Sequence, residues 1–201
     1  MVNLPQPLQD VVERLSSLPG VGPKSALRMA MTLLKWPEPQ ARGLGQSILS
    51  LRENLSICSV CGSLSDSDPC SICADPRRET GQLCVVGEWD SLLVMEEAGG
   101  YGGRYFILGG LLSPLDGINP GDLELEGLRT LLAQGNIGEV ILALGTTGDA
   151  EATGSYLKNM LQKEFPDIGI TRLAQGIPLG AEVKYMDRNT LRQSLAYRQK
   201  I

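Results

Sequence analysis

Four cysteines form the strongest chemical signal in the sequence. They lie in the pattern C-x2-C-x8-C-x2-C, at Cys58, Cys61, Cys70 and Cys73. Each C-x2-C turn offers two thiolates, and four thiolates complete a tetrahedral site for zinc. Residues 58–79 contain too little apolar surface to become ordered without such a clamp. We therefore predict a structural Zn²⁺ site here, with two disulfides as the alternative.

The N-terminus bears on the choice between zinc and disulfides. The first ten residues contain no basic segment followed by an apolar stretch, so we expect no signal peptide. No apolar run approaches 18 residues, so we expect no transmembrane span and no membrane partner. A cytoplasmic location follows as an expectation, and a reducing cytosol favours zinc over disulfides.

A second candidate site lies in the stretch "LPGVGPKSALRMA". Gly20 and Gly22 keep a turn free of side chains, so that backbone N–H groups at the start of the next helix can meet a phosphate. Lys24 and Arg28 are four residues apart and share a helix face. These features predict a helix-hairpin-helix that binds DNA phosphates independently of sequence. The alternative is a plain pair of helices whose turn serves packing alone.

Carboxylates follow two predicted strands. Glu88 comes after the apolar run "LCVV", and Asp149 and Glu151 come after "EVILALG" and a Gly/Thr turn. Because the carboxyl ends of parallel strands share one edge of a sheet, the three side chains could hold Mg²⁺. Alternatively, the acids only interact favourably with the helix N-terminus. A phosphate-binding loop is a further alternative, although no lysine follows the glycines.

Charge and composition exclude several classes of site. The chain has no histidine, which removes Ser-His and Cys-His nucleophiles and histidine metal ligands. Its net charge is −5, but the charge is segregated: residues 80–176 carry five Lys/Arg against thirteen Asp/Glu, whereas residues 177–201 carry five against two. Residues 1–57 are also slightly basic, with six against four. Contact with phosphate is therefore permitted at the two ends of the chain.

The elements that must position these groups follow from apolar periodicity. Helical spacing predicts helices over residues 6–17 and 23–34, with a third spanning Leu44 to Leu55, and residues 58–79 are expected to be irregular. Four apolar runs, "LCVV", "RYFIL", "EVILALG" and "IGITRLA", alternate with helical stretches near 91–98, 122–134 and 151–164, which predicts a mostly parallel α/β sheet with Cys84 in its core.

The C-terminal residues form a separate arm in this interpretation. The run "VKYMD" is a strand candidate, and a basic helix is expected from about Thr190 to Lys200. This helix either packs on its own domain or docks onto another subunit. The predicted fold class is α+β, with a helical unit at 1–57, a zinc-binding loop at 58–79, an α/β domain at 80–176 and a strand-and-helix arm at 177–201.

Taken together, these motifs resemble the RecR family of bacterial recombination mediators. The resemblance covers essentially the whole chain and includes "LPGVGPKSALRMA", "CSVC", "CSIC", "GGLLSPLDGINP", "QGIPLGAEV" and "TLRQSLAYRQKI". It implies a Toprim domain over residues 82–175 and a ring-shaped homotetramer joined by the hairpin units and the C-terminal arms. It also implies that Lys24 and Arg28 bind DNA, single- or double-stranded.

The same resemblance implies partners and a role. In this family RecO and RecF act with the ring to load the recombinase onto single-stranded DNA that is coated with its binding protein. A ring would also explain how an acidic protein can bind DNA. A few basic residues that are repeated around a hole give the acidic assembly a positive inner surface.

The acidic residues depart from the catalytic Toprim pattern. Catalytic Toprim domains carry a glutamate directly after the first strand, but this chain has Gly87 there, with Glu88 one residue later. We therefore expect a non-enzymatic domain whose acidic edge, Glu88, Asp149 and Glu151, docks basic partner surfaces. The alternative is a Mg²⁺-dependent Toprim nuclease or phosphoryl-transfer enzyme that uses the same three acids, and Mg²⁺ binding is left open.

Overall fold

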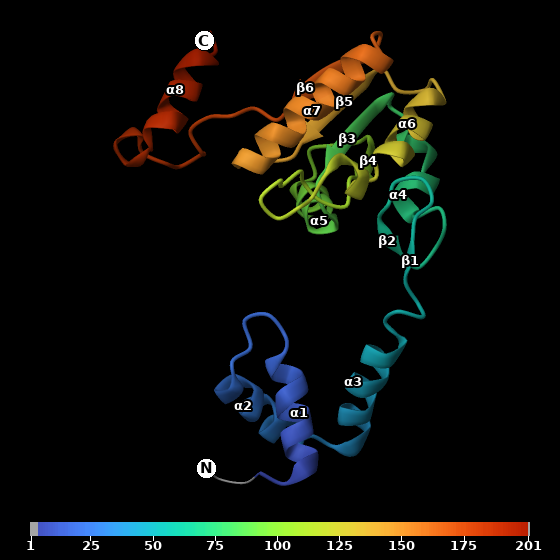
Figure 1. Ribbon diagram of the computed structural model, residues 1–201, viewed down its shortest axis with the longest axis vertical. Coiled ribbons are helices and arrows are strands. Elements are labelled where there is room, and N and C mark those ends of the chain that lie inside the picture. Colours follow the sequence, from blue (N-terminus) through green and yellow to red (C-terminus); the bar gives the residue numbers. More distant parts are fainter. Residues whose placement is uncertain (1–3, 201) are drawn as a thin grey trace. The chain divides into compact units, whose positions relative to one another are not determined.

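The N-terminal helices form a unit of their own. The computed structural model describes residues 4–200, and the chain divides between Leu55 and Ser56 into two compact units, which we describe separately (Figure 1). The first unit contains three helices: α1 (Gln6–Ser16), α2 (Pro23–Leu33) and α3 (Glu38–Ser50).

Small side chains bring α1 and α2 together. Ala26 and Ala30 of α2 are buried, with 0% and 2% of their surface exposed. Helix α3 differs from the expectation in its position. It begins just after Pro37 and ends at Ser50, so that Leu51 and Leu55 lie beyond it. Prolines in the first turn are compatible with a helix because their missing N–H would have no intrahelical partner.

The second unit begins with the segment that holds the four cysteines. We call residues 56–78 the cysteine module. It contains a short antiparallel hairpin of β1 (Ser56–Ile57) and β2 (Leu64–Ser65), a single helical turn, α4 (Ser71–Ala74), and a 3₁₀ turn, η1 (Pro76–Arg78). The module is therefore more regular than the irregular loop expected from its composition.

A four-stranded parallel sheet follows, as predicted. Its order is β4 (Arg104–Ile107), β3 (Gln82–Val86), β5 (Glu139–Ala143) and β6 (Gly169–Arg172). Every neighbouring pair is parallel. The register places Val85 beside Phe106 on one side and beside Leu142 on the other. The carboxyl ends of all four strands therefore meet at one edge.

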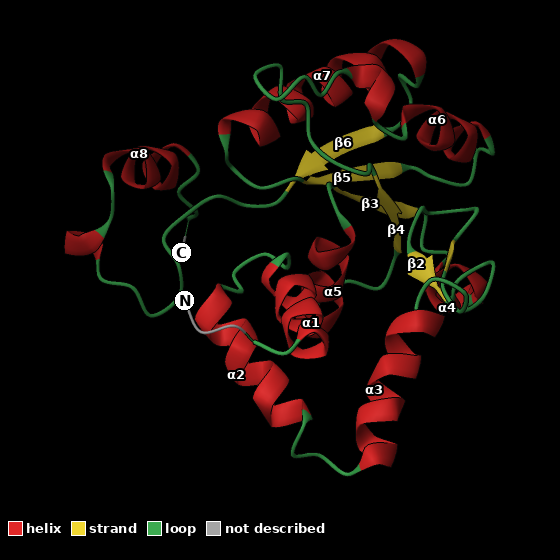
Figure 2. Cartoon of the chain, turned by 60° about the horizontal axis from the view of Figure 1, so that its bottom comes forward, coloured by secondary structure: helices red, strands yellow, loops and turns green. Residues whose placement is uncertain are grey.

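Helices cover the two faces of this sheet unequally. Figure 2 shows α6 (Leu125–Ala133) and α7 (Gly148–Glu164) on one face and α5 (Trp89–Ala98) on the other. The larger core lies under α6 and α7 and includes Leu83, Val85, Leu128 and Leu157. The smaller core under α5 includes Cys84, which is fully buried as predicted.

The C-terminal arm corrects one prediction. The run "VKYMD" is not a strand: Val183–Tyr185 form a 3₁₀ turn, η3. Val183 and Tyr185 are 61% and 73% exposed, and no strand pairs with this run within residues 4–200, so nothing holds it extended. A predicted helix does follow, as α8 (Arg188–Ala196), which ends earlier than expected.

Helix α8 begins where a side chain caps it. The Asp187 carboxylate accepts hydrogen bonds from the backbone N–H groups of Asn189 and Thr190 at 2.8 and 3.0 Å. This is an ordinary aspartate N-cap, and it sets the start of the helix two residues before the expected one. Among residues 4–200, none of the helices combines the length and the apolar character that crossing a membrane requires.

Candidate functional site

The four cysteines of the cysteine module converge on one point. One Sγ atom from each of Cys58, Cys61, Cys70 and Cys73 lies within 4.8 Å of the other three, all four residues are buried, and none forms a disulfide. The Sγ atoms of Cys61 and Cys70 are 3.6 Å apart. A tetrahedral zinc ion with bonds of about 2.3 Å separates its sulfur ligands by about 3.8 Å, so the cluster fits zinc.

Backbone hydrogen bonds shape the two knuckles. In the first, Gly62 N–H donates to the Cys58 carbonyl at 3.0 Å, and Gly62 has a φ of +74°, which favours glycine. Across the site, Cys70 N–H donates to the Cys58 Sγ at 3.3 Å. The neighbouring thiols, first of all that of Cys73, lower the pKa of Cys61 to about 6. One ligand is therefore readily available as the thiolate that a metal requires.

The cysteine module also borders the parallel sheet. Ile107 N–H of edge strand β4 donates to the Cys61 carbonyl at 2.9 Å, and an Arg104 Nη donates to the Cys73 carbonyl at 3.2 Å. Val60 packs against the larger core and Ile72 against the smaller one. The two knuckles thus contribute to both faces of the sheet at β4, which makes the cysteine module part of the domain that it precedes.

The helix-hairpin-helix stretch forms the turn that the sequence predicts. Gly20 adopts a φ of +77°, and Gly22 is the N-cap of α2 in an extended conformation, without a side-chain cap. No heavy atom would lie within 4 Å of a Cβ added at either glycine. A ligand can therefore approach the first backbone N–H groups of α2 through open space, without contact to side chains of the turn.

Lys24 and Arg28 stand next to this open helix start. Both are exposed on α2, and neither forms an ion pair within 4.0 Å with any residue that the structure describes. The first turn of α2 contains no acidic residue. Two cations without an ion-pair partner among the described residues therefore lie on α2, whose N-terminus is the positive end of the helix dipole. This arrangement attracts anions.

The three carboxylates at the sheet edge lie at the starts of two helices. Glu88 is the exposed N-cap of α5 and makes no side-chain cap hydrogen bond, while Asp149 and Glu151 lie in the first turn of α7. Within residues 4–200, only the four cysteines form a group of three or more possible metal ligands within 4.8 Å of one another. The structure therefore does not bring Glu88, Asp149 and Glu151 to a common ligand distance.

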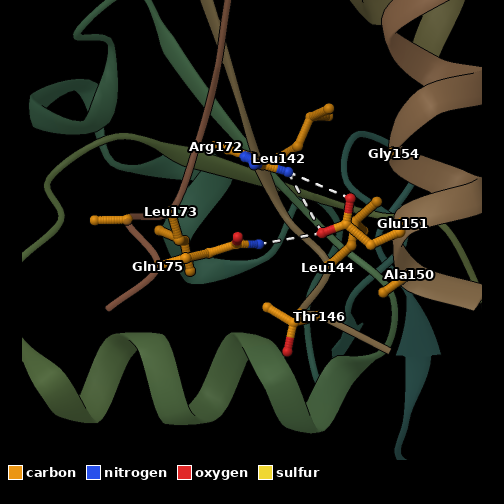
Figure 3. Close-up of a pocket in the computed structure, with 11 residues that line it drawn as sticks. Leu142, Leu144, Thr146, Ala150, Glu151, Gly154, Arg172, Leu173 and Gln175 are labelled. Carbon is orange, nitrogen blue, oxygen red and sulfur yellow. Dashed lines mark hydrogen bonds and ion pairs between the residues drawn. The ribbon is translucent and has the colours of Figure 1, made fainter. Parts of the chain in front are cut away.

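Glu151 already has partners from this chain (Figure 3). An Arg172 Nη donates to its two carboxylate oxygens at 3.3 and 3.4 Å, and Gln175 Nε2 donates to one of them at 3.1 Å. Gly87, where a catalytic Toprim glutamate would stand, is buried, and a Cβ there would lie 3.3 Å from Leu111 Cδ2.

Sequence reasoning missed Arg172 and Gln175. Arg172 is the last residue of β6, and Gln175 follows it. Strand β6 is the parallel neighbour of β5, and the chain after β5 continues into the first turn of α7 with Glu151. The signal was available, because residues at the carboxyl ends of neighbouring parallel strands meet. Because Arg172 lies within the apolar run "IGITRLA", its position predicts a strand and not a site residue.

Family models match four successive parts of the chain. They describe a RecR helix-hairpin-helix over residues 8–51, a RecR zinc finger domain of the four-cysteine type over residues 55–75, a Toprim domain over residues 81–174 and a RecR C-terminal region over residues 176–199. The zinc finger match includes all four clustered cysteines, so the cluster is a structural Zn²⁺ site.

Relatives match over the full length. The chain is 58% identical over 201 residues to the "Recombination protein RecR" of Maridesulfovibrio salexigens, covering 100% of both chains, and 58% identical over 199 residues to that of Nitratidesulfovibrio vulgaris, covering 99% of both. To the protein of the same name from Syntrophobacter fumaroxidans it is 43% identical over 195 residues, covering 97% of this chain and 96% of the other. The chain therefore belongs to the RecR family of recombination proteins.

Proposed function

We propose that this chain is a non-enzymatic mediator of DNA repair and recombination, which binds DNA through the α1–α2 hairpin without regard to sequence. It works with RecO and RecF to load the recombinase onto single-stranded DNA that is coated with its binding protein. The observation that carries the proposal is the open start of α2, where Gly20 and Gly22 leave the backbone accessible beside two cations, Lys24 and Arg28, that have no ion-pair partner among the described residues.

The hairpin favours phosphate over base contacts. Backbone N–H groups and the two cations are donors without acceptor capacity, which suits the phosphate oxygens found at every nucleotide. Binding of this kind has little sequence preference and weakens as salt rises, because each phosphate contact releases counterions. Two cations per chain give weak binding, so several copies must act together.

Unpartnered apolar surface supports assembly into a homotetrameric ring. In the first unit, Leu34, Ile48 and Leu49 are 70%, 64% and 72% exposed. In the arm, Tyr185 and Leu195 are 73% and 66% exposed, on a segment that also carries exposed arginines. Apolar surface of this extent is typical of interfaces between proteins. A ring would place four hairpins around one DNA and so raise the local concentration of cations.

The acidic edge supports docking rather than catalysis. Residues 80–176 carry thirteen acidic residues against five basic ones, which favours basic surfaces on RecO or RecF. The alternative, a Mg²⁺-dependent nuclease, requires carboxylates that converge on an ion. Glu151 is instead paired with Arg172, and this pairing favours the mediator over the nuclease.

The DNA contact is tested by fluorescence anisotropy with the zinc-loaded protein. Lys24→Ala/Arg28→Ala is compared with Lys35→Ala/Arg52→Ala, which removes two exposed cations of the same unit away from the start of α2. We expect the first variant to lose affinity equally for unrelated DNA sequences, and the second to bind as the wild type does. Equal losses in both variants would refute the assignment to the hairpin.

The absence of catalysis is tested on supercoiled plasmid with millimolar Mg²⁺. The mediator predicts no nicking. Nicking that Asp149→Ala abolishes would establish the nuclease instead.

A further inference from the structure

We propose that the Arg172 guanidinium takes the place of a divalent cation at the carboxyl edge of the sheet and ties Glu151 to the C-terminal helix α8. This inference concerns residues that the DNA-binding hairpin does not use. In this arrangement the acidic edge does not require Mg²⁺, and the position of α8 depends on the charge of Glu151.

The first half of the link satisfies Glu151. Arg172 ends β6, and Glu151 lies in the first turn of α7, so the pair joins the sheet to the helix that covers it. Both carboxylate oxygens accept from Arg172, at 3.3 and 3.4 Å, and Gln175 Nε2 adds a bond of 3.1 Å (Figure 3). A cation and an amide thus fill the coordination that a metal would otherwise require.

The second half of the link reaches α8. The other Nη of Arg172 donates to the Tyr197 hydroxyl at 3.3 Å, and the guanidinium carbon lies 5.9 Å from the centroid of the Tyr197 ring. Tyr197 is the C-cap residue of α8. One guanidinium therefore contacts α7 through its charge and α8 through both a hydrogen bond and a cation–π interaction.

Little else holds α8 at this place. Two pockets border the helix: one is lined by Arg172, Ile177 and Tyr197, and the other by Glu151, Thr190 and Arg192. No residue of α8 is buried. Because no residue of α8 is buried, the Arg172 link contributes a large share of what holds the helix against its domain.

The Mg²⁺ implied by the Toprim fold does not fit this arrangement. The three acids that the sequence nominated do not lie within a common ligand distance, and the charge of Glu151 is already neutralised. A divalent ion would have to displace Arg172 from Glu151 and thereby release Tyr197.

Hydrogen–deuterium exchange of the full-length, zinc-loaded protein tests the link. In Arg172→Gln we expect the amides of residues 188–197 to exchange about threefold faster or more, as the loss of a partly exposed ion pair implies. Tyr197→Phe keeps the ring but removes the hydroxyl, so its effect should be smaller and in the same direction. Arg129→Gln is the matched control, because it breaks the Arg129–Glu164 pair at the other end of α7.

Two results would overturn the inference. One is exchange in α8 that is unchanged in Arg172→Gln while zinc content and far-UV circular dichroism stay normal. The other is protection of residues 146–151 by millimolar Mg²⁺ in the wild type that Glu151→Gln removes. We expect Mg²⁺ to leave exchange at this edge unchanged in the wild type.

Discussion

The starts of α2 and α7 use the same backbone device with opposite side chains. Each helix follows a glycine-containing turn, and the positive end of its dipole lies at that turn. Beside α2 lie Lys24 and Arg28, which have no ion-pair partner among the described residues. Beside α7 lie Asp149 and Glu151, and Glu151 is paired with Arg172.

From this contrast we expect a helix start to bind phosphate only when its neighbouring side chains leave it free. At α7, the acids of the first turn already interact with the dipole, and Thr147 caps the helix by accepting from Ala150 N–H at 3.2 Å. An incoming phosphate there would meet negative charge. At α2, nothing within the described part of the chain competes for the same groups, so an anion from outside can take them.

The largest expected effect comes from removing a zinc ligand. The cysteine module borders the sheet that positions the start of α7, so the loss of zinc also affects that helix start. Cys61→Ser should lower the free energy of unfolding of the second unit by several kcal/mol, since metal binding is part of its folding energy. Thermal unfolding together with a zinc assay measures this. A variant that loses zinc but keeps the wild-type melting temperature would contradict the structural role.

A smaller effect is expected at Thr153, which ties the start of α7 to the loop that follows β4. Its hydroxyl accepts from Leu112 N–H at 2.9 Å, donates to the Asp149 carbonyl at 2.6 Å and is fully buried. Thr153→Val leaves Leu112 N–H unpaired and should cost about 2 kcal/mol in chemical denaturation. The control is Thr130→Val, whose hydroxyl bonds only the Glu126 carbonyl on an exposed helix face. Equal costs would argue against the loop anchor.

The Arg78–Glu96 pair links the cysteine module to α5 and predicts a pH dependence. The Arg78 guanidinium holds the pKa of Glu96 below its usual range. The pair therefore stabilises the fold at neutral pH, and this contribution disappears as the pH falls below about 4.3, the ordinary glutamate pKa, through the lower folded value. Glu96→Gln should cost about 1 kcal/mol at pH 7, and the difference from the wild type should vanish in acid. A constant difference from pH 7 to pH 2 would contradict the pairing.

The smallest expected effect lies in the hairpin turn itself. Gly20 has a φ of +77°, so Gly20→Ala should destabilise the first unit by about 1 kcal/mol. Gly22 has a φ of −77° and open space around it, so Gly22→Ala should change stability by only a few tenths of a kcal/mol. Denaturant titrations compare the two variants. Equal losses would mean that the left-handed turn is not what Gly20 provides.

Much of the fold could be predicted because local patterns determined it. The apolar runs of β3 and β5, the helix start at Pro23 and the burial of Cys84 all follow from periodicity, proline position and apolar context. The run "VKYMD" misled, because a strand forms only when another strand pairs with it, and pairing is not visible in a single segment.

The candidate sites divide in the same way. The four cysteines are close in the sequence, so their convergence could be read from spacing alone. The pairing of Glu151 with Arg172 joins residues 21 positions apart, and it depends on β6 lying beside β5. The sequence predicted the acids at this edge, but the arginine that neutralises one of them required the sheet order.

In the proposed function, the free cations at the start of α2, and not the overall charge of the protein, hold DNA. The most direct test is the slope of log K against log salt for duplex binding, measured for the wild type and for Lys24→Ala/Arg28→Ala. Each lost phosphate contact should reduce the steepness by about 0.9, so we expect a reduction of about 1.8 for each hairpin that contacts the duplex. An unchanged slope would contradict it.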